Sequence, residues 1–472
     1  MGSFNAVVTT GIYCLPSCTG RPNKNHVQTF ELAAAAEAAG FRACLRCRPY
    51  RKQPSISSRV APALVCRAVR LVVDGALDEA TEEDLGGRLG VSGRHIRRLF
   101  LEYLGVTPDQ LARSTRVHFA RRLLDDSDLS IADVTFAAGF GSVRQFNREC
   151  QATFHATPSQ LRARRKNSDR LIADGGLTLR IPFQPPFDWQ GWAGWAQQRA
   201  IGGVEYVSPD CYRRTVVVDG DAGVIEVAPG DDDQLVLRAH LPHWKGLIHV
   251  AQRVRAIFNL DAEIDAANEH LRADPLVGPL VRSRPGIRPP GAWDVFEASI
   301  EAVVGAHASF AETSATMQQI ARRYGKPVMG LQALGLHRTF PAPQDMAAAD
   351  VAELGLDPSS AAAIRRLARA AADAPAAADP IRGAQGSLLC AIGSPMTQSH
   401  ALLRLRLGEP DAYPASSPSL LAALSKRTGC DVAPHQATGV AEAWRPWRAY
   451  ATAYLWSTLE RTCQPGQLLL SR

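Results

Sequence analysis

Four cysteines near the start of the chain have the residue type and spacing that a metal site needs. Cys14 and Cys18 form a C-x3-C pair, Cys44 and Cys47 form a C-x2-C pair, and 25 residues separate the two pairs. Two thiol pairs joined by a foldable segment let four thiolates converge on Zn²⁺ at about 2.3 Å. We therefore expect one zinc ion with four cysteine ligands.

Such a quartet also offers covalent chemistry. A zinc-bound thiolate is a nucleophile at neutral pH, whereas a free cysteine is only about a few per cent ionised. A purely structural zinc is nevertheless the more common use of four cysteines. The residues around the quartet must decide between the two roles.

Those residues resemble the N-terminal zinc domain of the Ada family of methylphosphotriester-repair regulators. The match covers about residues 4–50, in the strings TTGIYCLPSC and AGFRACLRCRP, and includes Thr9, Thr10, Gly11, Tyr13, Pro16, Ser17, Arg21, Gly40, Phe41 and Arg48. The resemblance implies that Cys14 accepts a methyl group irreversibly from a DNA phosphotriester, and that Arg21 contacts DNA. One departure is Leu15, where the family usually has arginine.

Methylation of one ligand would change the charge of the centre. Four thiolates around Zn²⁺ carry a net charge of about −2, which repels phosphate, and a thioether in place of one thiolate leaves about −1. At about 8 Å the lost charge is worth roughly 0.5–2 kcal/mol for an effective dielectric between 80 and 20. Because several phosphates feel the change, we expect DNA affinity to rise by about tenfold or more.

Composition describes a multidomain protein without a membrane segment. The chain has 472 residues, 46% hydrophobic and 21% charged, and no apolar run approaches the ~20 residues of a membrane span. The six other cysteines are scattered without a pairing pattern. Scattered thiols beside a zinc quartet indicate a reducing compartment, so we expect a cytoplasmic, nucleoid-associated protein with no membrane partner.

The positive charge is concentrated in the first third of the chain. Residues 1–170 hold 25 Lys and Arg against 16 Asp and Glu, a net +9, whereas residues 171–472 hold 28 against 30, a net −2. This distribution favours a nucleic-acid partner for the N-terminal part.

Two helix-turn-helix patterns follow the quartet. Residues 81–103 and 131–154 each read as helix, tight turn and helix, with the turns at Gly90 and at 139–141. With the intervening long helix, this order resembles the AraC-type DNA-binding domain. The outward positions of the two second helices are the candidates for DNA contact: Arg94, His95, Arg97, Arg98, Arg144, Gln145, Asn147 and Arg148.

Residues 177–463 resemble the AlkA family of alkylated-base DNA glycosylases. The match rests on a β-rich start and on the strings GAWDVFEASIEAVVGAHAS, LRLRLGEPDAYPAS and EAWRPWRAYATAYLW. Such proteins flip a damaged base and cleave its glycosidic bond with the help of an aspartate. Here the catalytic aspartate's position is occupied by Ser417, and losing one preorganised electrostatic group costs about 10²–10³ in rate.

Other positions of this half also depart from the family. Pro418 is expected to perturb the helix start beside Ser417, and the phosphate-binding hairpin loop, aligned with residues 391–399, has Pro395 in place of a glycine. Asp411 is the alternative acid, although the family has its own aspartate there. The PCHR motif of the second Ada methyl acceptor is absent from the sequence, so methyl transfer from a base is not expected.

The sequence thus predicts a multidomain α+β chain. Its expected parts are a zinc domain (1–52), an all-α double helix-turn-helix domain (58–165), a β-rich AlkA-like subdomain (172–290) and an all-α helix-hairpin-helix domain (291–463). We predict an alkylation-responsive regulator whose partners are promoter DNA, methylphosphotriester lesions and RNA polymerase. The alternatives are an active 3-methyladenine DNA glycosylase and a plain AraC-type transcription factor with a structural zinc.

Overall fold

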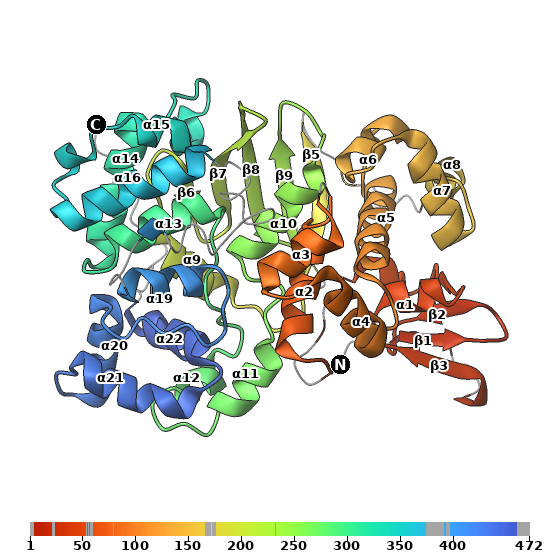
Figure 1. Cartoon of the computed structure of the whole chain (residues 1–472), viewed down its shortest axis with the longest axis horizontal. Helices are drawn as coiled ribbons and strands as arrows, with labels where there is room; N and C mark the ends of the chain where they lie inside the picture. The colour runs from red at the N-terminus through yellow and green to blue at the C-terminus, as the bar shows by residue number, and fades with distance from the viewer. Residues whose placement is uncertain are drawn as a thin grey trace. The chain divides into compact units, whose positions relative to one another are not determined.

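A computed structural model shows a chain that divides into two compact units (Figure 1). It describes residues 4–20, 24–52, 54, 56, 60–78, 80–165, 171, 176–231, 233–373, 391–392 and 397–459. The first unit comprises residues 1–183 and 234–253, and the second comprises residues 184–233 and 254–472. Within the described residues, no helix is long and apolar enough to cross a membrane.

The N-terminal module of the first unit is a four-stranded sheet in the order β3-β1-β2-β4. Strand β1 (Phe4–Val7) is antiparallel to β2 (Ile12–Cys14) and to β3 (Val27–Phe30), and β2 is parallel to β4 (Arg42–Ala43). The Ala-rich segment of the module forms α1 (Ala33–Ala38), and the short 3-10 helices η1 (Lys24–His26) and η2 (Pro49–Arg51) complete the module.

Parallel pairing of β2 with β4 explains how two of the cysteines meet. Tyr13 lies opposite Ala43, and the Cys44 N–H donates to the Tyr13 carbonyl at 3.0 Å. Cys14 and Cys44 therefore leave neighbouring strands at the same edge of the sheet.

Both predicted helix-turn-helix motifs are confirmed. The helices are α2 (Ala63–Val73), α3 (Glu82–Leu89), α4 (Gly93–Leu104), α5 (Pro108–Asp126), α6 (Ile131–Ala137), α7 (Val143–Phe154) and α8 (Pro158–Ala163). Gly90 ends α3 with a φ of +73°, which a residue with a side chain rarely adopts. At Gly86 a Cβ would lie 2.6 Å from the Gly93 nitrogen, so glycine permits the close approach of α3 and α4.

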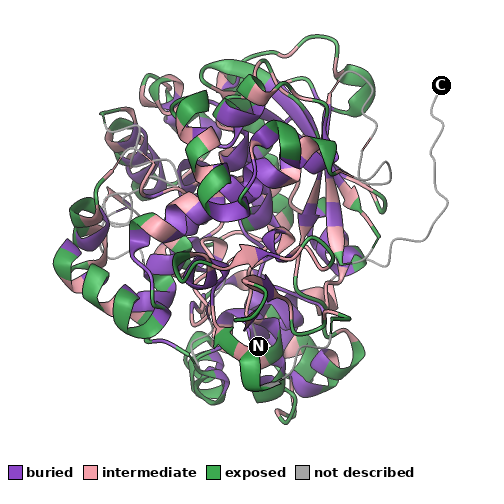
Figure 2. Ribbon diagram, turned by 90° about the vertical axis from the view of Figure 1, so that its right-hand side faces the viewer, coloured by how far each residue is buried: buried purple, intermediate pink, exposed green. Residues whose placement is uncertain are grey.

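Hydroxyl side chains start most of these helices. In each of six helices a serine or threonine side chain accepts a hydrogen bond from the backbone N–H three residues further on, at Thr81, Ser92, Thr107, Ser130, Ser142 and Thr157. Apolar side chains of α2–α5 then form one core with residues of the N-terminal module, among them Leu32 and Ala35. The N-terminal module and the helices of the first motif thus share a core. Figure 2 shows that many helices of the chain carry buried residues on one side and exposed residues on the other.

The β-rich and helical parts expected after residue 176 are also present. In the first unit β5 (Leu177–Pro182) is antiparallel to β9 (Gln234–His240). In the second unit β6 (Glu205–Val207), β7 (Tyr212–Val218) and β8 (Asp221–Pro229) form an antiparallel meander. Helix α10 (Leu247–Ile257) crosses the division between the units.

The rest of the second unit is helical. Its helices are α9 (Trp189–Gln197), α11 (Ile264–Leu271), α12 (Gly278–Ser283), α13 (Val295–Val304), α14 (Phe310–Tyr324), α15 (Pro343–Ala347), α16 (Pro358–Asp373), α19 (Thr397–Arg406), α20 (Pro418–Thr428), α21 (Pro434–Ala441) and α22 (Arg448–Trp456). Aromatic side chains such as Trp444 and Tyr454 fill a core between α11, α12, α20 and α22. The predicted fold class, multidomain α+β, is confirmed.

Candidate metal centre and DNA-binding helices

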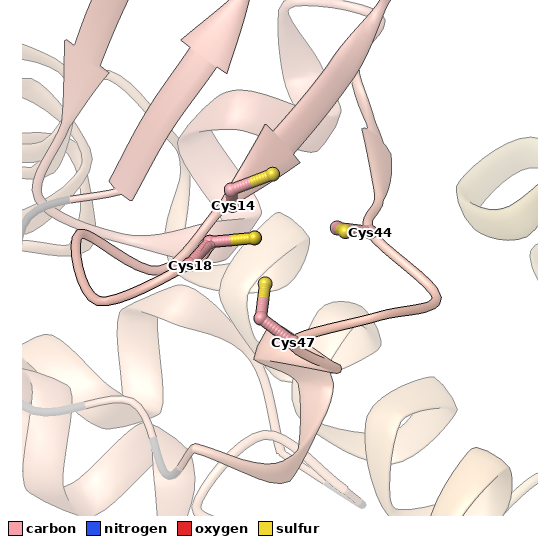
Figure 3. Close-up of side chains that lie close together, drawn as sticks. All are labelled: Cys14, Cys18, Cys44 and Cys47. Atoms are coloured by element: carbon pink, nitrogen blue, oxygen red, sulfur yellow. The ribbon is translucent and has the colours of Figure 1, made fainter. Parts of the chain in front are cut away.

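The four cysteines of the quartet come together at one edge of the N-terminal sheet. Their sulfur atoms all lie within 4.8 Å of one another and point toward a common centre (Figure 3). Cys14 ends β2, Cys44 follows β4, and tight turns bring Cys18 and Cys47 back toward them. All four side chains are partly exposed, so the centre is open to a partner.

The donor set fits a zinc ion. Tetrahedral coordination with bonds of about 2.3 Å places the sulfurs about 3.8 Å apart, which this cluster accommodates. Burial raises the pKa of the Cys14 thiol well above its ordinary value and raises that of Cys47 to about 12. Four neutral thiols gain nothing from such proximity, whereas a divalent cation stabilises them as thiolates. The quartet is therefore a site for one metal ion.

Backbone hydrogen bonds distinguish the four sulfurs. The Leu15 N–H donates to Cys47 Sγ and the Arg46 N–H donates to Cys44 Sγ, each at 3.4 Å. Within the described residues no backbone N–H donates to the sulfur of Cys14 or Cys18. Such donation withdraws charge from a thiolate and so lowers the nucleophilicity of Cys44 and Cys47 as ligands.

One basic residue of the centre was missed by the sequence reasoning. Arg46 lies between Cys44 and Cys47, is exposed, and donates to Thr19 Oγ1 at 3.3 Å. Its position within the C-x2-C pair was the available signal. The predicted DNA contact Arg21 lies outside the described residues.

The second helix of the first motif, α4, presents its predicted residues outward. Arg94, Arg97 and Arg98 are exposed, while His95 is half-buried. Arg97 already pairs with Glu82 at 3.0 Å, and Arg98 lies 3.7 Å from Glu102.

In α7 two of the side chains predicted to contact DNA form hydrogen bonds with the protein backbone instead. Gln145 Oε1 accepts from the Gly141 N–H at 3.1 Å, and Asn147 Nδ2 donates to the Val143 carbonyl at 2.9 Å. Arg144 and Arg148 are exposed, and Arg148 pairs with Glu149 at 3.2 Å.

Arg94 and Arg144 occupy the same place in the two motifs. Each is the second residue of its helix, directly after a serine cap and one glycine or valine. Neither has a hydrogen bond or ion pair within the part of the chain that the structure describes. These two arginines are therefore the strongest candidates for contact with base edges.

Arg94→Ala and Arg144→Ala are each expected to weaken promoter binding by about 1–3 kcal/mol, or roughly 5- to 150-fold. The reason is that each variant loses a bidentate contact to guanine. Arg97→Ala is the matched control, since Arg97 is held by Glu82, and we expect a smaller loss. Fluorescence anisotropy with labelled promoter DNA measures all three. Equal losses for the three variants would contradict the assignment.

In the glycosylase-like half, Ser417 is almost fully buried and caps no backbone group of α20. The expectation that Pro418 perturbs this helix was wrong. Pro418 is the first residue of α20, where its missing N–H has no partner to lose and its fixed φ suits the helix.

Charged side chains surround the cavity that Ser417 lines. Arg199, Glu301 and Arg406 share that cavity with Trp456. Glu301 pairs with Arg199 and, at 3.0 Å, with Arg406, while both guanidinium groups lie about 5 Å from the Trp195 ring centroid. The carboxylate that shares the cavity with Ser417 is thus neutralised by two arginines.

Asp411, the alternative catalytic acid, is also paired with arginines. Asp411 accepts hydrogen bonds from Arg445 at 2.6 Å and from Arg448 at 2.7 Å. Residues 393–396 of the expected hairpin loop lie outside the described residues.

Together, a four-cysteine centre, two helix-turn-helix motifs and a glycosylase-like frame on one chain define the class of fused alkylation regulators and glycosylases. Three family models match it: the metal binding domain of Ada over residues 2–50, a helix-turn-helix domain over 85–164 and the AlkA N-terminal domain over 178–294. The chain is 35% identical to the probable bifunctional transcriptional activator/DNA repair enzyme AlkA of Mycobacterium tuberculosis strain H37Rv, over 96% of this chain and 92% of that protein. It belongs to that family.

Two relatives from Escherichia coli each match part of the chain. DNA-3-methyladenine glycosylase 2 is 30% identical over 59% of this chain and 96% of its own length. The bifunctional transcriptional activator/DNA repair enzyme Ada is 26% identical over 49% of this chain and 55% of its own length. Among solved structures, a 3-methyladenine DNA-glycosylase from Archaeoglobus fulgidus aligns with a TM-score of 0.49 and 19% identity, over 59% of this chain and 97% of that one. The predicted family resemblances and the zinc site are confirmed.

Proposed function

We propose that the chain is an alkylation-responsive transcriptional regulator in which Cys14 accepts one methyl group from a DNA methylphosphotriester. The observation that carries the proposal is the open four-cysteine centre in the same unit as two DNA-binding motifs. A metal ion at this centre would keep the ligand sulfurs ionised at neutral pH. The chain's own residues supply the rest.

In the transfer, the Cys14 sulfur attacks the methyl carbon of the phosphotriester. The S–C bond forms, the O–C bond breaks, and the electron pair stays on the phosphate oxygen as an ordinary diester anion. Among the described residues no backbone N–H donates to Cys14 Sγ, and this supports its role as the attacking sulfur. Exposed Arg46 is placed to bind the phosphate next to the lesion.

The methylated protein then binds its promoter more tightly, because the centre has lost one negative charge. The basic first third of the chain supports a DNA partner. Activation also requires a contact with RNA polymerase, and such a protein would work in the cytoplasm at the nucleoid.

Two measurements test the proposal. After incubation with methylphosphotriester DNA, the intact mass of the protein should rise by about 14 Da, the mass that one methyl transfer adds. Promoter affinity should rise by about tenfold in the same sample. Unchanged mass with intact promoter binding would instead support a plain transcription factor with a structural zinc.

A glycosylase activity is the second candidate, because the relationship to DNA-3-methyladenine glycosylase 2 covers nearly all of that enzyme. Ser417 and the neutralised Glu301 argue against it. We expect release of 3-methyladenine at least about 100-fold below that of the E. coli enzyme in the same assay. Release within about tenfold of it would overturn this part of the proposal.

A further inference from the structure

A buried carboxylate joins the metal-binding module to the long helix between the two DNA-binding motifs. Glu37 on α1 accepts hydrogen bonds from Tyr13 Oη at 2.6 Å and from Ser114 Oγ at 2.7 Å, and it pairs with His118 Nε2 at 2.5 Å. The side chains of Glu37 and His118 are 8% and 4% exposed. We call these four residues the Glu37 cluster.

The cluster begins one residue from the candidate methyl acceptor. Tyr13 lies in β2, paired with Ala6 on one side and Ala43 on the other, and Cys14 follows it directly. A shift of the strand end at Cys14 therefore moves the backbone that carries the Tyr13 hydroxyl.

The cluster ends on the element that carries both recognition helices. Ser114 and His118 are one turn apart on α5, and α5 packs against α4 of the first motif and against α6, α7 and α8 of the second. A change in how the module holds α5 would thus reach both DNA-binding surfaces.

A second group of contacts joins the module to the C-terminal end of α5. Tyr50 Oη donates to Asp125 at 2.9 Å, and Arg51 pairs with Asp126 at 3.1 Å. These residues follow Cys47 by three and four positions. The module therefore contacts α5 at two places, at Ser114 and His118 near its middle and at Asp125 and Asp126 at its C-terminal end.

An isolated carboxylate in an alanine-rich helix would be costly to bury, and its three partners offset that cost. Such a network has few alternative arrangements, because its partners lie on two packed elements, Tyr13 on β2 and both Ser114 and His118 on α5. It therefore transmits a displacement better than apolar packing does.

We propose that Glu37 is the positioning residue that couples the state of Cys14 to the placement of α5. Methylation acts on DNA affinity in two ways: through the lost charge, which acts directly across space, and through the Glu37 cluster, which adjusts the two recognition helices. This inference rests on the proposed methyl transfer. It adds that the gain in DNA affinity on methylation needs the Glu37 cluster, whose residues bind neither metal nor DNA.

The test compares promoter affinity before and after methylation in the full chain. Wild type, Glu37→Gln and His118→Gln are each loaded with zinc, checked for metal content and methylation by mass, and titrated with promoter DNA. We expect all three to take up the methyl group, and the gain in affinity on methylation to fall by about fivefold in both variants. His118→Gln leaves Tyr13 and Glu37 in place, so it remains informative if Glu37→Gln folds poorly.

Asp78→Asn is the matched control. The change of charge is the same, and among the described residues Asp78 bonds to Arg116 of α5 and to His249, not to the cysteine module. This variant should keep the full gain. A gain in Glu37→Gln and His118→Gln equal to that of wild type would overturn the inference while leaving the methyl transfer intact, whereas the absence of any gain in wild type would overturn the proposed function itself.

Discussion

Cys14→Ala is expected to abolish methyl uptake from methylphosphotriester DNA, from one group per chain to none. The variant removes the sulfur that we propose as the nucleophile. Intact mass spectrometry after exposure to the DNA measures the loss. The methylation-dependent gain in promoter affinity should vanish with it.

Two comparisons separate the loss of the nucleophile from other effects. Cys430→Ala removes an exposed thiol that lies in the second unit, and it should take up methyl like wild type. Cys18→Ala removes a ligand but retains Cys14, so zinc content in the two ligand variants shows how much of the effect is loss of metal. Methyl uptake by Cys14→Ala at the wild-type level would refute the assignment.

Removal of the metal is expected to have the largest effect on structure. The strands of the N-terminal sheet are two to four residues long, and the sheet has few fully buried side chains, such as Tyr13 and Ala6. Structural zinc in peptides of this size contributes about 10–16 kcal/mol of apparent binding free energy at pH 7. Without it, β1–β4 should unfold and methyl uptake should stop.

Hydrogen exchange with and without a chelator measures this effect. Protection should disappear from residues 4–52 and weaken in α2, because Leu32 and Ala35 share the α2 core. Protection in α7 should persist, since its core residues Phe146 and Cys150 are buried within the helical region. Unchanged protection of β1–β4 after chelation would show that the metal does not hold the module together.

The sequence was most informative where local rules apply. The cysteine spacing predicted the metal site, and the glycine turns between helical patterns predicted both helix-turn-helix motifs, because such turns depend on a few neighbouring residues. Ser417 was recognised because its neighbours follow a known motif. The domain boundaries and the roles of individual site residues stay predictions.

Such local rules do not predict contacts between residues that are far apart in the sequence. Glu37 and His118 are 81 residues apart, and Glu37 sits in a helix that reads only as alanine-rich packing. Likewise, Gln145 and Asn147 have the side chains of base readers, yet both bond to the backbone of their own motif. At Pro418 the family motif suggested a disturbed helix, whereas proline suits the first position of α20.

The central claim is that Cys14 is the methyl acceptor, and fragment-ion mapping of the methylated chain tests it most directly. Cys14 and Cys18 lie on one tryptic peptide, so backbone fragment ions between them must locate the added mass. We predict that the methyl group lies on Cys14 alone. A methyl group on Cys18, Cys44 or Cys47, or none on the quartet, would contradict the account.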